Sequence, residues 1–176
     1  LEEGSIDKDE ITSLNECLGT MRKSLEEFKQ LSLVQSKEQF TISEFSASLR
    51  ILHSSMLNQK KVTFKFLHDD CGDLVVSQPF HTLIQILSNL IQNATKAVKN
   101  TRTKKVDILF FHKGNNLYIE VCDTGCGVKK ENDERIFNMN VSFTGGSGIG
   151  LFHAKWALKQ LKGDIKLIKE INDYST

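Results

Sequence analysis

One segment, residues 79–98, constrains the fold of this chain more than any other part of its sequence. Its apolar residues recur with helical spacing, which predicts a helix that buries one broad face in a core. These apolar residues are Leu83, Ile84, Ile86, Leu87, Leu90, Ile91, Ala94 and Val98. Proline suits a first helical position, because the N–H that it lacks would be unpaired there. Pro79 is therefore expected to begin the helix.

A row of polar side chains follows a second face of this predicted helix. Asn89, Asn93 and Lys96 stand at positions i, i+4 and i+7, so their side chains lie along one line. Two carboxamides and an ammonium group on a largely apolar helix need polar partners. A magnesium ion with phosphate oxygens would satisfy all three groups, and so would water on a solvated face. The helix alone leaves both interpretations open.

Two glycine-containing loops favour the first interpretation. Residues 121–128 read Val-Cys-Asp-Thr-Gly-Cys-Gly-Val after a strand-like run, and residues 144–151 read Thr-Gly-Gly-Ser-Gly-Ile-Gly-Leu before a predicted helix. The order of Asn-bearing helix, D-x-G-x-G and G-x-G-x-G resembles the N, G1 and G2 boxes of the GHKL ATP-binding superfamily. Within it, the patterns N-L-I-x-N-A-x-K, R-I-F and G-S-G-I-G-L are most similar to those of sensor histidine kinases. The resemblance covers nearly the whole chain and is most specific over residues 79–163.

The resemblance implies an α+β fold of two domains. Residues 38–176 would form the ATP-binding catalytic domain, a two-layer α/β sandwich (the Bergerat fold) with a mixed sheet. Residues 1–37 would form a long helix that precedes it. The apolar residues of this helix repeat every 3.5 residues, as in a coiled coil or a helical bundle: Ile11, Leu14, Leu18, Met21, Leu25 and Phe28. The resemblance makes it the second helix of the dimerisation hairpin, and packing on its own domain is the alternative.

The catalytic domain is expected to combine strands and helices. Strands are predicted at residues 39–42, 61–66, 74–77, 106–112, 117–123 and 164–169, and helices at residues 43–56 and 147–162. Residues 129–143 lack firm periodicity and are expected to form a short ATP lid, whose Ile136–Phe137 pair resembles the F box of the family. Trp156 is expected in the core, and Gly163 is expected as the C′ residue that ends the last helix.

The resemblance assigns the first loop to the adenine base and the second to the phosphates. Asp123 would accept a hydrogen bond from the exocyclic amine of adenine, while Gly125 and Gly127 would let the backbone approach the base. A purely structural turn is the alternative for this loop. The second box would present backbone N–H groups to phosphates at a helix N-terminus, and it can also act as a lid hinge. It comprises Thr144, Gly146, Ser147, Gly148, Ile149, Gly150 and Leu151, of which Ile149 and Leu151 are expected to point into the core.

The polar row of the helix is expected to handle the metal and the phosphate charge. Asn93 is the expected Mg²⁺ ligand, with Asn89 as a second candidate, and Lys96 would neutralise phosphate oxygens. In hydrolytic relatives (gyrase, MutL and the large chaperones) a glutamate stands four residues before the metal-binding asparagine and activates water. Asn89 occupies that place here, and its amide has no useful basicity. The pattern favours phosphoryl transfer to an external nucleophile over hydrolysis.

The function implied by the resemblance is that of the ATP-binding catalytic portion of a two-component sensor histidine kinase. It would transfer the γ-phosphoryl group of ATP to a histidine outside this segment, because no histidine here has a phosphoacceptor context: His53, His68, His81, His112 and His153. The expected partners are ATP, the phosphoacceptor hairpin, a response-regulator receiver domain and, in the full protein, a second copy. The alternatives are a GHKL ATPase, a serine kinase of the anti-sigma type, and a nucleotide-binding module without turnover.

Composition limits the remaining possibilities. A formal net charge of +1 argues against a broad nucleic-acid surface, and no apolar run approaches a membrane span. We therefore expect no membrane contact by this segment and a cytoplasmic location. Because the chain begins at Leu1, we expect a longer parent protein, for which a membrane anchor remains open. The cysteines lack C-x-x-C or zinc-like spacing, which favours packing over metal binding: Cys17, Cys71, Cys122 and Cys126.

Overall fold

The structure, a computed structural model, describes residues 39–133, 135–139, 141 and 148–169. The chain divides into two units, Leu1–Lys37 and Glu38–Thr176, and each is a body by itself. The first unit lies outside the described residues. The long helix expected there, its heptad-like seam and its role in dimerisation therefore stay predictions.

A mixed three-stranded sheet forms one layer of the second unit. β2 (Thr63–His68) pairs in parallel with β4 (Lys105–Lys113), and β4 pairs antiparallel with β5 (Asn116–Asp123). Two short strands, β1 (Phe40–Thr41) and β3 (Val75–Val76), form a separate antiparallel pair. The strands predicted at residues 106–112 and 117–123 are confirmed, and they pair as an antiparallel hairpin that places Asp123 opposite Val106.

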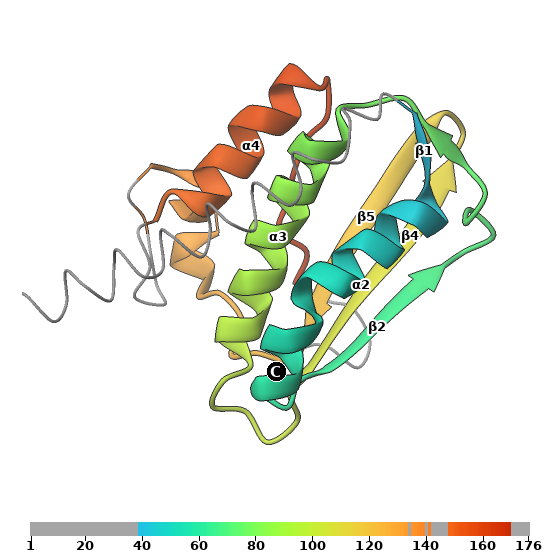
Figure 1. The fold of residues 1–176 in the computed structure, drawn as a ribbon. Helices are drawn as coiled ribbons and strands as arrows, with labels where there is room; N and C mark the ends of the chain where they lie inside the picture. The colour runs from blue at the N-terminus through green and yellow to red at the C-terminus, as the bar shows by residue number, and fades with distance from the viewer. Residues whose placement is uncertain (1–38, 134, 140, 142–147, 170–176) are drawn as a thin grey trace, which may run out of the picture. The chain divides into compact units, whose positions relative to one another are not determined.

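Three helices form the second layer and lie on one face of the sheet (Figure 1). They are α2 (Ile42–Gln59), α3 (Phe80–Ala97) and α4 (Gly150–Gln160), and two short 3₁₀ turns, η1 (Lys130–Asn132) and η2 (Arg135–Phe137), precede α4. Helix α2 begins at a capping box, in which Glu44 N–H donates to Thr41 Oγ1 at 3.1 Å and Thr41 N–H donates to Glu44 Oε2 at 2.9 Å. The α+β two-layer arrangement with a mixed sheet is confirmed.

The core lies between the helices and the inner face of the sheet. Four phenylalanines from β1, α2, α3 and β4 contact one another there, with ring centroids 5.0–6.4 Å apart: Phe40, Phe45, Phe80 and Phe110. The predicted apolar face of α3 is buried, except that Leu90 is only half-buried. Because this face packs into the core, the opposite side of α3 is left for polar contacts.

Several local expectations are wrong. Pro79 is the N-cap of α3 and not its first residue. Trp156 is 55% exposed, because α4 turns its small residues, Ala154 and Ala157, inward instead. Residues 164–169 form no strand, since they have no ladder partner among the described residues.

The end of α4 also differs from the expectation. The C′ residue is Lys162, with a φ of +59°, and Gly163 follows it and donates its N–H to Leu158 O at 2.8 Å. This is the Schellman arrangement, in which the residue after the left-handed one bonds back to the helix. The C′ residue is therefore one position earlier than expected, and a lysine instead of the glycine holds the left-handed conformation.

Candidate functional site

One face of α3 carries the candidate site. Asn89, Asn93 and Ala97 stand at i, i+4 and i+8, so they follow one line over a length of about 12 Å. Asn89 and Asn93 are half-buried, whereas Lys96, one position before Ala97, is exposed. The carboxamides thus sit where a ligand can reach them without entering the core.

Each predicted glycine loop contacts one end of this line. A Cβ atom built on Gly150, at the start of α4, would lie 3.6 Å from Cγ and Oδ1 of Asn89. A Cβ atom on Gly125 would lie 2.6 Å from Cβ of Ala97, which shows that the first loop touches the other end. Asn93 stands between the two contacts. The three boxes that the sequence predicts are therefore brought together along α3.

Asp123 lies at the end of β5, where the chain leaves the sheet. The Gly125 N–H donates to Asp123 Oδ1 at 2.8 Å. Burial raises the pKa of the Asp123 carboxyl, and the hydrogen bond from Gly125 opposes that shift. A carboxylate has about four acceptor sites, so this one contact leaves capacity for a donor on a ligand. Gly127, further along the loop, has a φ of +66° and open space around its Cα.

The second loop is described only in its last part. Gly148 has a φ of +68°, a conformation that favours glycine, and Gly150 begins α4. Ile149 is 46% exposed, so its expected place in the core is wrong, whereas Leu151 is half-buried. Thr144, Gly146 and Ser147 lie outside the described residues. The first turn of α4 contains no acidic side chain that would compete with an anion for its N–H groups.

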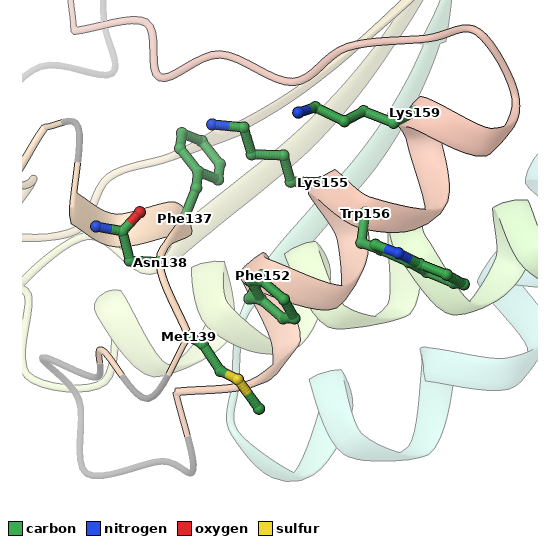
Figure 2. A pocket seen from close by; sticks show the side chains of 7 residues that line it. All are labelled: Phe137, Asn138, Met139, Phe152, Lys155, Trp156 and Lys159. Carbon is green, nitrogen blue, oxygen red and sulfur yellow. The ribbon is translucent and has the colours of Figure 1, made fainter.

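The segment before the second loop packs against α4 through an aromatic side chain. Ile136 and Phe137 of η2 are 6% and 9% exposed, and Lys155 Nζ lies 5.3 Å from the centre of the Phe137 ring. Figure 2 shows Phe137 and Lys155 beside a hollow of about 350 Å³ between η2 and α4. The predicted burial of the Phe137 side chain against the rest of the domain is confirmed, and the ATP lid itself stays a prediction. None of the predicted site residues lines this hollow.

Thr124, between Asp123 and Gly125, is a site residue that the sequence does not reveal. Its hydroxyl donates to Thr103 O at 2.6 Å and accepts the Lys105 N–H at 3.1 Å. The D-T-G pattern gives no sign of this, because Thr103 lies 21 positions earlier in the chain. Ala97 is also absent from the predicted site, although its place eight residues after Asn89 is a signal that helical periodicity provides.

No three histidine, cysteine, aspartate or glutamate side chains within the described ranges gather into a metal-binding group. None of the described helices has both the length and the apolar character that a membrane span requires.

Comparison with known proteins adds to this geometry. Residues 80–176 match the family described as histidine kinase-, DNA gyrase B-, and HSP90-like ATPase. Sensor protein CitS of Bacillus subtilis (strain 168) is 38% identical over 121 residues, which cover 66% of this chain and 22% of CitS. The chain therefore spans about a fifth of the length of this curated relative.

Solved structures show the same fold. The catalytic domain of histidine kinase ThkA aligns with a TM-score of 0.67 at 24% identity, covering 76% of this chain and 89% of that domain. Histidine kinase ThkA in complex with the response regulator protein TrrA aligns with a TM-score of 0.67 at 21% identity, covering 99% of this chain and 50% of the kinase chain. With the family match over more than half of the chain, these findings show that the protein belongs to the histidine kinase-, DNA gyrase B-, and HSP90-like ATPases and carries their ATP-binding domain.

Proposed function

We propose that this chain is the catalytic portion of a sensor histidine kinase, which transfers the γ-phosphoryl group of ATP to a histidine outside residues 1–176. The observation that supports this most directly is the pair of contacts along α3. Gly150 lies against Asn89 and Gly125 lies against Ala97, so one helix face spans the distance between a base-binding loop and a phosphate-binding loop.

At the base end, Asp123 accepts the exocyclic amine of adenine. Its carboxylate is held by the Gly125 N–H and is partly buried, so a hydrogen bond from the base replaces lost solvation. Gly125 and Gly127 keep side chains away from the base. Guanine carries no donor at the same ring position, so this contact selects ATP over GTP.

At the phosphate end, the G2 residues bind the phosphates and α3 binds the metal. Gly148, Gly150 and the first turn of α4 offer backbone N–H groups to anionic oxygens, and Thr144, Gly146 and Ser147 belong to the same box. Asn93, with Asn89 as a second ligand, fits Mg²⁺ because a carboxamide oxygen is a hard neutral donor. When bound, Mg²⁺ neutralises phosphate charge, and the exposed ammonium of Lys96 assists it.

The reaction class follows from Asn89. An amide cannot take a proton from water, so hydrolysis lacks its base, whereas an imidazole nucleophile needs little activation. Positioning and charge neutralisation then supply most of the catalysis. In the full protein we expect a homodimer, a phosphoacceptor hairpin and a response-regulator receiver domain as partners. The names of CitS and of the ThkA–TrrA complex support this extension.

A transfer assay tests the proposal. The chain is mixed with γ-labelled ATP, Mg²⁺ and a separate segment that carries a phosphoacceptor hairpin. Acid-labile, base-stable label on that segment is the expected result. Release of labelled phosphate without labelled segment would indicate an ATPase, and acid-stable label would indicate a serine kinase. Binding of ATP with neither product would reduce the chain to a nucleotide-binding module.

Asp123→Asn tests the adenine assignment separately. We expect ATP binding to be lost while the fold remains intact, because the amide presents a donor as well as an acceptor to the base. Asp73→Asn, in an exposed turn, is the matched control and should bind ATP as the wild type does. Unchanged ATP affinity in Asp123→Asn would contradict the assignment.

A further inference from the structure

We infer that Thr124 is a positioning residue, whose hydroxyl fixes the loop that carries Asp123 and thereby sets the affinity for the adenine base. The inference rests on the role proposed for Asp123. It concerns a side chain whose hydroxyl bonds to the backbone of Thr103 and Lys105 and acts through these neighbours.

The first observation is that a side-chain acceptor replaces a backbone acceptor at the end of the β4–β5 ladder. Val106 and Asp123 form the last paired positions of β4 and β5, so Lys105 and Thr124 would be the next pair. The Thr124 N–H donates to Lys105 O at 3.1 Å, as an antiparallel ladder requires. The Lys105 N–H, however, donates to the hydroxyl Oγ1 of Thr124 at 3.1 Å. The side chain thus takes the place of a backbone acceptor at the residue where β5 turns into the loop.

The second observation is that the hydroxyl proton is directed away from the site. Thr124 Oγ1 donates to Thr103 O at 2.6 Å, and Lys105 O lies 3.4 Å away as a weaker alternative acceptor. A hydroxyl has one proton and two lone pairs, so these contacts use the donor and one lone pair. Direct recognition of the base by Thr124 would require breaking them.

The third observation connects this loop to the end of α3. Thr103 O also accepts from Thr101 Oγ1 at 2.7 Å, and the Thr101 N–H donates to Val98 O at 3.3 Å. The loop is therefore held at two points: Gly125 meets Ala97 at the end of α3, and the Thr124 hydroxyl bonds to the segment of residues 103–105. Both points follow Asp123 directly in the chain, so they restrict the direction in which its carboxylate points.

Removal of the Thr124 hydroxyl should let the Asp123 carboxylate change its direction. In Thr124→Val the shape is retained, but Lys105 N–H and Thr103 O each lose a hydrogen-bond partner. The loop can then move away from β4, and the Gly125 N–H separates more often from Asp123 Oδ1. Thr124→Ser keeps the hydroxyl. Thr101→Val is the matched control, because it removes a bond to the same Thr103 carbonyl without touching the Asp123 loop.

The experiment measures these variants in the full chain of 176 residues. The first measurement is amide hydrogen exchange at Gly125, which needs no nucleotide. The second is the dissociation constant for MgATP and for MgGTP, and the third is phosphoryl transfer at saturating ATP. Thr124→Ala serves as a second variant without the hydroxyl if Thr124→Val does not fold.

For Thr124→Val we expect exchange at Gly125 and the dissociation constant for MgATP to rise by about tenfold each, with less preference for ATP over GTP. Transfer at saturating ATP should stay within about twofold, as should every measurement on Thr124→Ser and Thr101→Val. Unchanged exchange at Gly125, or equal losses in Thr124→Val and Thr101→Val, would overturn the inference. If the wild type binds no ATP while exchange still rises only in Thr124→Val, the proposed function fails and the positioning of Asp123 stands.

Discussion

Replacing Gly125 by alanine tests the arrangement of the site most directly. Gly125 has no positive φ, unlike Gly114, Gly127 and Gly148, so alanine can adopt its backbone conformation. The obstacle is space: the new Cβ would lie 2.5 Å from Asp123 Oδ1, 2.6 Å from Ala97 Cβ and 3.0 Å from the Ala97 carbonyl carbon. Carbon atoms in contact prefer about 3.5–4.0 Å, so the loop must move by about 1 Å.

The magnitude follows from opposing terms. Overpacking of this kind destabilises the fold by about 1–3 kcal/mol. Alanine also reduces the conformational entropy of the unfolded chain, which stabilises the fold by about 0.4–1 kcal/mol. We expect a net loss of about 1–2 kcal/mol in urea unfolding. The larger effect is on binding, because the carboxylate is pushed from its position. Losing a hydrogen bond to a charged acceptor, about 1.5–3 kcal/mol, raises the ATP dissociation constant by roughly 10- to 100-fold.

Gly114→Ala is the matched control for this variant. Gly114, in the hairpin between β4 and β5, has a φ of +58°, and a Cβ atom added to it would meet no other atom within 4 Å. Alanine there introduces backbone strain of about 1 kcal/mol far from the site. The two variants should therefore lose comparable stability, while only Gly125→Ala loses ATP affinity in a calorimetric titration.

A double variant separates the two clashes. Adding Ala97→Gly to Gly125→Ala removes the Cβ–Cβ contact and leaves the contact with Asp123. We expect a favourable coupling of about 0.5–1 kcal/mol in stability, with partial recovery of ATP affinity. The reasoning is refuted if Gly125→Ala binds ATP within about twofold of the wild type, or if its effects and those of Ala97→Gly are additive.

Other predictions concern the remainder of the domain. Burial lowers the pKa of His53 from 6.5 to about 4. Between these two pH values, the unfolded chain binds a proton at His53 that the folded chain does not bind. Stability should fall as the pH drops through this window, by up to about 3 kcal/mol, and His53→Gln should flatten this pH dependence in urea unfolding. Cys126 is exposed, whereas burial raises the pKa of Cys122 to about 11, so iodoacetamide at pH 8 should label Cys126 at least about tenfold faster by peptide mass spectrometry. Lys162→Gly should stabilise the chain by about 0.5–1 kcal/mol in thermal unfolding, because glycine adopts a φ of +59° without strain.

Structure could be predicted from the sequence where a pattern of residues within one segment reflects a physical constraint on that segment. The strands predicted at residues 106–112 and 117–123 and the apolar face of α3 each follow from the apolar residues of one segment, and both predictions are confirmed. The glycine of the D-x-G pattern is expected to make room for a base. In the structure the nearest obstacles to a side chain at Gly125 include Ala97 of α3, so the same residue is required for a second reason.

Prediction fails where the constraint joins residues that are distant in the chain. Thr124 bonds to Thr103, and no periodicity connects a loop threonine with a loop carbonyl 21 residues earlier. Large aromatics are usually buried, which favours a core position for Trp156, but the close approach of α4 to α3 is made by small side chains. Residues 164–169 alternate as a strand does, yet strand assignment depends on a hydrogen-bonded neighbour that one segment cannot specify.

We expect substitutions on one face of α3 to lower stability and substitutions on the other face to lower nucleotide binding. Ile84, Ile86 and Ile91 are at most 1% exposed, so truncation on that side creates cavities that lower the stability of the whole domain. Asn89 and Asn93 are only half-buried on the other side, so their truncation should lower stability less. Asp123 also lowers the stability of the domain. Burial raises its folded-state pKa above the ordinary value, so the ionised form destabilises the free protein at neutral pH. A carboxylate that serves only the fold would be relieved of that cost by an uncharged replacement. Under the proposed function, a ligand that donates a hydrogen bond to Asp123 would offset that cost.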